Sequence, residues 1–139
     1  MTSDQAASRF LNPEGLPRIP GFSQVVDAIG GRTVYVSGQV ALDAGGRIVG
    51  EGDFKAQARQ VFSNVQRALG AAGVEFADVV KLGMFVTDLT QLATLRAVRD
   101  EFVDIARPPA STLVQVAALF RPEFLVEVDA IAVGRADPG

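Results

Sequence analysis

The clearest hydrophobic pattern lies in the last third of the chain, in two segments that read as β-strands. Residues 112–117 alternate and are rich in β-branched side chains, residues 120–122 interrupt the run, and residues 124–133 alternate again. Every second side chain of a strand points to the same face. One face of the second strand therefore carries two carboxylates, Glu127 and Asp129, among apolar neighbours. Carboxylates inside so apolar a strand are the most informative residues of the sequence.

The same alternation divides both strands between a core face and a second, mixed face. The expected core positions are Val114, Val116, Val126, Val128 and Ala130. The mixed face takes Ser111, Leu113, Gln115, Leu125, Glu127, Asp129 and Ile131. Such a face is too apolar to lie in water and too polar to lie in a core. We therefore expect partner subunits of a symmetric homo-oligomer to cover it in part.

Two helices are expected upstream of these strands. Asp53 is a plausible N-cap for a helix to about Ala72, which carries an apolar stripe at helical spacing. Asp88 or Thr90 caps a second helix that runs to about Ile105, before two prolines. Its inward side chains are expected to be Leu92, Leu95, Val98, Phe102 and Ile105.

Two turns are predicted in the first half of the chain. Residues 22–29 can pair with residues 32–37 across Gly30-Gly31, a two-residue glycine turn suited to a hairpin. Residues 40–42 and 47–49 flank a second turn. Gly38, inside a strand pattern, indicates a β-bulge or a close backbone approach.

The remaining segments complete a single domain. Residues 1–20 are rich in turn formers and are expected to be an irregular N-terminal arm, followed by one domain at 21–139. Residues 79–87 are apolar on both faces, which predicts a central strand. The resulting order β-β-β-α-β-α-β-β predicts an α/β two-layer sandwich, with two helices on one face of a mixed sheet.

Composition narrows the chemistry. The chain has no cysteine and no histidine, which excludes a Ser-His-Asp triad and thiolate or histidine metal ligands; we expect no metal and no cofactor. Its only tyrosine is Tyr35. The net charge of −3 and the scattered basic residues disfavour nucleic acid as a partner. No apolar run is long enough to span a bilayer, and the absence of cysteine fits a reducing cytoplasm, where we expect the protein to act.

Seven short motifs follow one another along the chain in a fixed order. They are Val36-Ser37-Gly38-Gln39, Gln57-Ala58-Arg59-Gln60 with Asn64-Val65, Ala71-Ala72-Gly73, Phe85-Val86-Thr87-Asp88-Leu89, Pro109-Ala110-Ser111, Val114-Gln115-Val116-Ala117 and Val126-Glu127-Val128-Asp129-Ala130. Each motif alone is weak, but the ordered set resembles the RidA/YjgF family. These are the reactive intermediate deaminases, also called the endoribonuclease L-PSP family. The resemblance covers roughly Gly21 to Val133.

The resemblance implies a fold and a chemistry. The family fold is a chorismate-mutase-like α/β sandwich, and its members are typically homotrimers whose sheets close into a barrel, with small-molecule clefts between subunits. The best-known family reaction hydrolyses 2-imino or enamino acids to 2-keto acids and ammonia. By position, Glu127 matches the family's water-handling carboxylate, and Ser37 matches a motif serine near the cleft.

Departures from the family pattern concentrate in the substrate site. Deaminating members carry an arginine in a Pro-Ala-Arg-Ser motif that grips the substrate carboxylate. Here Ser111 stands in its place, followed by Thr112, and Leu113 stands where a cysteine is common. Phe22 replaces a cleft tyrosine, and Arg96 falls at a cleft asparagine. The resemblance thus makes Phe22, Arg96, Ser111 and Thr112 candidates for substrate binding, together with Ser37.

Several alternatives remain open at this point. Either Arg96, from the second helix, or Arg107, from a neighbouring subunit, could replace the missing guanidinium. Glu127 could also be a half-exposed strand residue without a chemical role. For the whole protein there are three hypotheses: an imine or enamine deaminase, a metabolite-binding module without turnover, and an RNA-cleaving protein. The acidic balance and the absent histidine make the last the least favoured.

Overall fold

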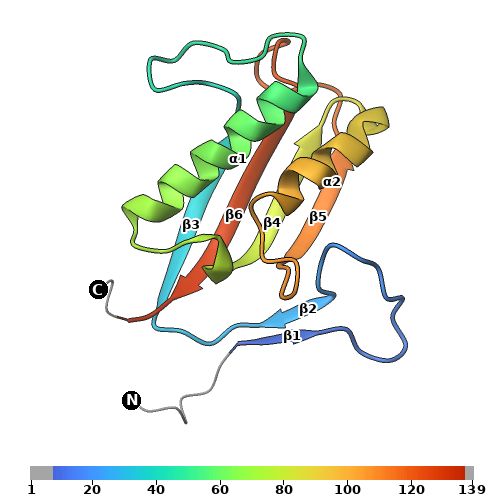
Figure 1. Cartoon of the computed structure of the whole chain (residues 1–139), viewed down its shortest axis with the longest axis vertical. Helices are drawn as coiled ribbons and strands as arrows, with labels where there is room; N and C mark the ends of the chain where they lie inside the picture. The colour runs from blue at the N-terminus through green and yellow to red at the C-terminus, as the bar shows by residue number, and fades with distance from the viewer. Residues whose placement is uncertain (1–7, 137–139) are drawn as a thin grey trace.

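The computed structural model describes residues 8–136, in which two helices cover one face of a four-stranded sheet (Figure 1). The strand order is β3-β6-β4-β5. The strands are β3 (Arg32–Gln39), β4 (Val79–Val86), β5 (Ala110–Gln115) and β6 (Val126–Gly134). β6 runs antiparallel to both of its neighbours, whereas β4 and β5 run parallel. The predicted α/β two-layer sandwich is confirmed, and so is the central position of the strand over residues 79–87.

The first helix begins and ends close to its predicted bounds. α1 (Phe54–Ala71) starts after Asp53, whose side chain accepts a hydrogen bond from the backbone N–H of Ala56 at 3.1 Å. Its apolar stripe is buried against the sheet. Figure 1 shows α1 and α2 side by side on the same face of the sheet. The core lies between these helices and the sheet, and no element formed by residues 8–136 covers the other face.

The second helix is shorter than predicted. A 3₁₀ turn, η2 (Leu89–Gln91), follows the N-cap Asp88, and α2 (Leu92–Asp100) stops five residues before Ile105. Asp104 accepts a hydrogen bond from the N–H of Ala106 at 3.0 Å, so a local side-chain turn competes with further helix. Ile105, expected to point inward, is 66% exposed. That expectation was wrong.

The predicted hairpin across Gly30-Gly31 is also wrong. β2 (Val25–Asp27) pairs with β1 (Arg9–Leu11), so the segment expected to be an irregular arm contains a strand. The N–H of Gly31 donates to the carbonyl of Gly134 at 2.9 Å, and a Cβ on Gly30 would collide with Val133. The two glycines therefore let the chain pass closely over the end of β6 instead of reversing it.

The second predicted turn, at residues 43–46, forms without regular strands around it. Only an isolated bridge joins Leu42 to Ile48. The side chain of Asn64, on α1, donates to the carbonyls of Val40 and Leu42 at 3.1 and 2.9 Å. Backbone hydrogen bonds from Asp43 to Arg47 and from Val49 to Ala41, both 2.9 Å, close the turn, and the side chain of Asn64 holds it against the helix. A further 3₁₀ turn, η1 (Phe76–Asp78), leads from α1 into β4.

The predicted faces of the last two strands are half right. On β6, Val126, Val128 and Ala130 are buried beneath the helices, and Glu127 and Asp129 lie on the uncovered face, as expected. On β5 the faces are reversed. Leu113 packs against the core, and Val114 is 40% exposed.

Register explains the reversal on β5. Leu113 lies opposite Met84 of β4, whose side chain is buried under the helices, and neighbouring positions of two paired strands share a face. Leu125, which was also expected on the mixed face, packs against the core as well. Alternation reports which side chains share a face, but a strand with valine and leucine on opposite sides does not show which face is inward.

Candidate functional site

Glu127 is the second residue of β6 and lies on the uncovered face of the sheet, opposite Phe85 of β4. Its side chain is half-buried and accepts no hydrogen bond from any described residue. Burial, and secondly the negative charge of Asp129, raise the pKa of Glu127 above its usual value. A carboxylate that is partly desolvated and free of partners can accept a proton from a bound water.

The backbone of β3 approaches this carboxylate closely. A Cβ on Gly38 would lie 2.0 Å from Oε2 of Glu127, so only glycine leaves room for the carboxylate at this place. The β3–β6 register shifts between Val36 and Gln39, which confirms the predicted bulge. The bulge turns Ser37 outward beside Glu127's neighbour Gly38, and the Ser37 side chain is exposed. Ser37 thus lies on the strand that pairs with the strand of Glu127, one residue before the glycine that faces the Glu127 carboxylate.

A second group of predicted residues lies on the other side of the sheet. Phe22, Arg96 and Ser111 line one small cavity of about 200 Å³ between α2, β5 and the segment before β2. Its other lining residues are Pro20, Met84, Leu92, Leu95, Arg99 and Leu113. The Ser111 hydroxyl has no hydrogen-bond partner among residues 8–136. We call this space the α2 pocket. Its wall combines apolar side chains with a hydroxyl and two guanidinium groups.

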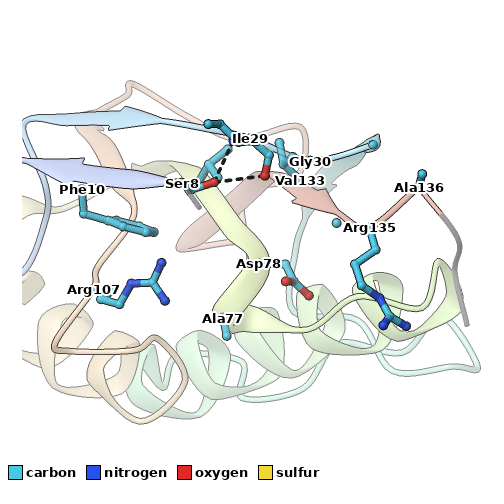
Figure 2. Close-up of a pocket in the computed structure, with 13 residues that line it drawn as sticks. Ser8, Phe10, Ile29, Gly30, Ala77, Asp78, Arg107, Val133, Arg135 and Ala136 are labelled. Carbon is cyan, nitrogen blue, oxygen red and sulfur yellow. Dashed lines mark hydrogen bonds between the residues drawn. The ribbon is translucent and has the colours of Figure 1, made fainter. Parts of the chain in front are cut away.

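Two of the predicted binding residues lie elsewhere. Thr112 is on the uncovered face and accepts a hydrogen bond from Nζ of Lys81 at 2.9 Å. Arg107 stacks over the ring of Phe10, 4.6 Å from its centre, in a separate open cavity beside the β1–β2 ribbon (Figure 2). Within one chain, Arg107 therefore does not share a cavity with Arg96 or Ser111.

The Glu127 region and the α2 pocket cannot meet inside one subunit. Ser111 lies opposite Leu82, and Glu127 lies opposite Phe85, three residues further along β4. That spacing is about 10 Å along the strands and about 10 Å across two strand intervals. The two side chains also point to opposite faces of the sheet. A site that uses both must combine the Glu127 of one subunit with the α2 pocket of another.

The chain is similar in sequence to known proteins of one family. The sequence profile described as Endoribonuclease L-PSP matches residues 15–134. The chain belongs to the endoribonuclease L-PSP (RidA/YjgF) family. Protein DfrA of Myxococcus xanthus is 38% identical over 128 residues, 91% of this chain and 96% of DfrA. The 2-iminobutanoate/2-iminopropanoate deaminase of Salmonella typhimurium is 38% identical over 131 residues, 92% of this chain and 99% of the deaminase.

Solved structures of the L-PSP family share the fold. The conserved Rid family protein YyfB of Yersinia pestis superposes with a TM-score of 0.81 at 37% identity, over 92% of this chain and 99% of YyfB. The TdcF protein of Escherichia coli, solved with bound serine, gives a TM-score of 0.67 at 33% identity, over 90% of this chain and 98% of TdcF. Relatives of this L-PSP protein thus include one described as a deaminase and one crystallised with an amino acid.

One residue of the α2 pocket was missed by the sequence analysis. Arg99 lies one helical turn after Arg96, and its side chain is 7% exposed. The spacing of two arginines at i and i+3 was visible, but an arginine on a helix is usually solvated, so nothing in the sequence indicated burial. Among residues 8–136 no group of three acidic, histidine or cysteine side chains gathers to bind a metal ion. In the same part of the chain, neither helix is long and apolar enough to cross a membrane.

Proposed function

We propose that this L-PSP family protein hydrolyses small 2-imino acids to 2-keto acids and ammonia, with Glu127 as the catalytic carboxylate. The observation that carries the proposal is the partly desolvated Glu127 side chain, which lies over Gly38 without a hydrogen-bond partner among the described residues. Relatives that are 36–38% identical over nearly their whole length are named 2-iminobutanoate/2-iminopropanoate deaminases. The environment of Glu127 and the names of these relatives both favour activation of a water molecule beside an imine carbon.

The reaction needs three proton transfers. Water adds to the imine carbon while the carboxylate of Glu127 accepts one water proton, which forms a carbinolamine. Glu127 then donates that proton to the nitrogen, the C–N bond breaks so that ammonia leaves, and the proton of the remaining hydroxyl passes to the ammonia as the keto group forms. Overall, an iminium acid and water give a keto acid and ammonium. A carboxyl group with a raised pKa suits both the accepting and the donating step.

The cleft would lie between subunits. β5 is an edge strand, and its exposed Val114 stands on the same uncovered face as Glu127, so a neighbouring subunit that covers this face would also reach the edge beside the α2 pocket. We propose a homotrimer with three such clefts, each with Glu127 and Ser37 from one subunit and Phe22, Arg96 and Ser111 from the next. Thr112 and Arg107 lie outside this set.

A second candidate function follows from Ser111. Where the family resemblance places a substrate-binding arginine, this chain has a short hydroxyl side chain. A charged hydrogen bond contributes about 1.5–3 kcal/mol, so its loss weakens the grip on a carboxylate unless another cation replaces it. The alternative is a protein that binds a metabolite in the same cleft without turnover. We do not propose RNA cleavage, because the net charge of −3 opposes phosphate binding.

Ammonia release from freshly generated 2-iminobutanoate tests the proposal. The rate is measured above the spontaneous hydrolysis rate for the wild type, for Glu127→Gln and for Glu75→Gln. The last variant removes an exposed carboxylate before the start of β4, whereas Phe85, the partner of Glu127, lies near the end of that strand. Loss of activity in Glu127→Gln alone supports catalysis. Wild-type protein that gives only the spontaneous rate, yet shows a ligand-induced rise in melting temperature with 2-oxobutanoate, would establish the binding function instead.

A further inference from the structure

Arg99 is the one charged residue whose side chain is buried within residues 8–136. The segment around Gly21 covers it: a Cβ on Gly21 would lie 2.4 Å from Nη2 and 3.1 Å from Nη1 of Arg99. Gly21 has a φ of +98°, which favours glycine, so the backbone can pass directly over the guanidinium. Arg99 nevertheless lines the α2 pocket, so its guanidinium stands between the protein interior and the cavity.

The hydrogen bonds of Arg99 leave part of its guanidinium unused. Nε and Nη2 both donate to the same oxygen, Oδ1 of Asp100, each at 3.0 Å. Nη1 donates to no described residue. A guanidinium has five N–H donors, and a planar carboxylate is the group that matches a pair of them.

The charges around the cavity do not balance. Arg96 and Arg99 lie three positions apart on α2 and both line the cavity. Among the described residues that line this cavity and the adjoining one, Asp100 is the only acidic residue. Arg96 has no ion pair within residues 8–136. Two cations one helical turn apart repel each other. The buried Arg99 is paired with Asp100, so the unpaired charge is that of Arg96, which is exposed. One positive charge is left over, which a single bound anion would neutralise.

We propose that Arg99, together with Arg96 and the Ser111 hydroxyl, forms the carboxylate subsite of this protein. The missing strand arginine of the family is thus replaced by two arginines from α2. The apolar wall around them, made by Phe22, Leu92 and Leu113 among others, would accept an aliphatic side chain. A cavity of about 200 Å³ suits a small monocarboxylate with a short aliphatic chain. This inference rests on the proposed function, because it names the carboxylate end of the same substrate.

Binding of 2-oxobutanoate, a stable keto acid, tests the subsite without turnover. Calorimetry compares the wild type with Arg99→Gln and with Arg67→Gln, an exposed arginine on α1 that has no ion pair in the described chain. The neutral 2-oxobutanamide serves as the uncharged probe. We expect Arg99→Gln to bind the keto acid about 10- to 100-fold more weakly. Arg67→Gln should bind it as the wild type does, and the amide should bind equally to all three proteins.

A fold defect is separated from a lost contact by a second measurement on the wild type. The ¹⁵Nε resonance of Arg99 should shift on addition of 2-oxobutanoate and stay in place with 2-oxobutanamide. Unchanged keto-acid affinity in a folded Arg99→Gln protein, or no shift of this resonance at saturation, would overturn the inference. Imine hydrolysis that survives in Arg99→Gln refutes the subsite but keeps the proposed function. Arginine-dependent binding without any hydrolysis keeps the subsite and refutes the proposed function.

Discussion

At the scale of single residues, the account depends on the environment of Glu127. Two causes raise its pKa: burial in a sheet face, and then the charge of Asp129 two residues away. The carboxylate form of Glu127 is the one that accepts a proton from water. Because its pKa is raised, this form becomes protonated at a higher pH than in an ordinary glutamate as the pH falls. The position of the acid limb in the pH–activity profile should therefore depend on the charge of Asp129.

Asp129→Asn should move the acid limb of kcat/KM to lower pH. The substitution removes a negative charge and so lowers the pKa of Glu127, which keeps the carboxylate ionised in more acidic solution. The measurement is a pH–rate profile of imine hydrolysis for the wild type and the variant. An acid limb that stays in place, or that moves to higher pH, would contradict the assignment of Glu127 as the titrating base.

Gly38→Ala should lower kcat while the fold is kept. The new Cβ would meet the carboxylate of Glu127, which is the free end of a flexible side chain and can swing aside at little cost in stability. The reacting geometry, however, tolerates little displacement, so we expect a loss of roughly 100-fold. Gly70→Ala is the control, because a Cβ there meets nothing within 4 Å. Full activity in Gly38→Ala would show that the carboxylate position is unimportant.

At the scale of elements, α1 positions the chain on both sides of the site. Its buried Gln57 donates hydrogen bonds to the carbonyls of Gly50 and Glu123, at 3.2 and 2.9 Å, and accepts one from the N–H of Leu125 at 2.9 Å. One amide thus ties the segment before β6 to the helix layer. Because β6 begins at Val126, these hydrogen bonds fix the start of the strand that carries Glu127.

Gln57→Leu should destabilise the protein by about 2–4 kcal/mol, because it removes three hydrogen bonds and leaves the carbonyl of Glu123 and the N–H of Leu125 without these partners. Urea denaturation measures the change in the free energy of unfolding. Gln66→Leu, at an exposed position of the same helix, should change it by less than about 0.5 kcal/mol. Equal stability of the two variants would refute this role of Gln57.

The helices, strands and turns also show which parts of the fold can be predicted from the sequence. Periodicity predicted α1 to within a residue or so, the Gly38 bulge and the central strand, because each depends on local chemistry. It failed at Gly30-Gly31, since a hairpin and a close passage over β6 make the same demand on glycine. It failed on β5, because a strand with apolar residues on both sides reveals its inner face only through its partner Met84. Arg99 is buried because the segment around Gly21, far away in the sequence, covers it. The residues next to Arg99 in the sequence therefore do not predict its burial.

At the scale of the whole molecule, the uncovered face of the sheet needs a partner. Tyr35 is 77% exposed on β3, and Val114 is 40% exposed on β5, so apolar and aromatic surface reaches from one edge of the sheet to the other. Glu127 and Asp129 lie between them. This face is the one that a trimer would enclose.

Val114→Lys should break the assembly. A charge placed on that face would be desolvated against the neighbouring subunit without a partner. Sedimentation analysis should give three times the chain mass of 14.6 kDa for the wild type and a smaller particle for the variant. Lys55→Arg, on an exposed helix position, is a control that should stay trimeric. A wild-type protein that sediments as a monomer would exclude clefts between subunits.

The central claim is that each site is shared between two subunits, and mixing two inactive variants tests it most directly. Glu127→Gln removes the carboxylate, and Ser111→Trp fills the α2 pocket. When the two variants are co-assembled in equal amounts, about a quarter of the clefts combine an intact pocket with an intact Glu127, so we predict about a quarter of wild-type turnover. Turnover that stays at the level of the separate variants would contradict a shared site.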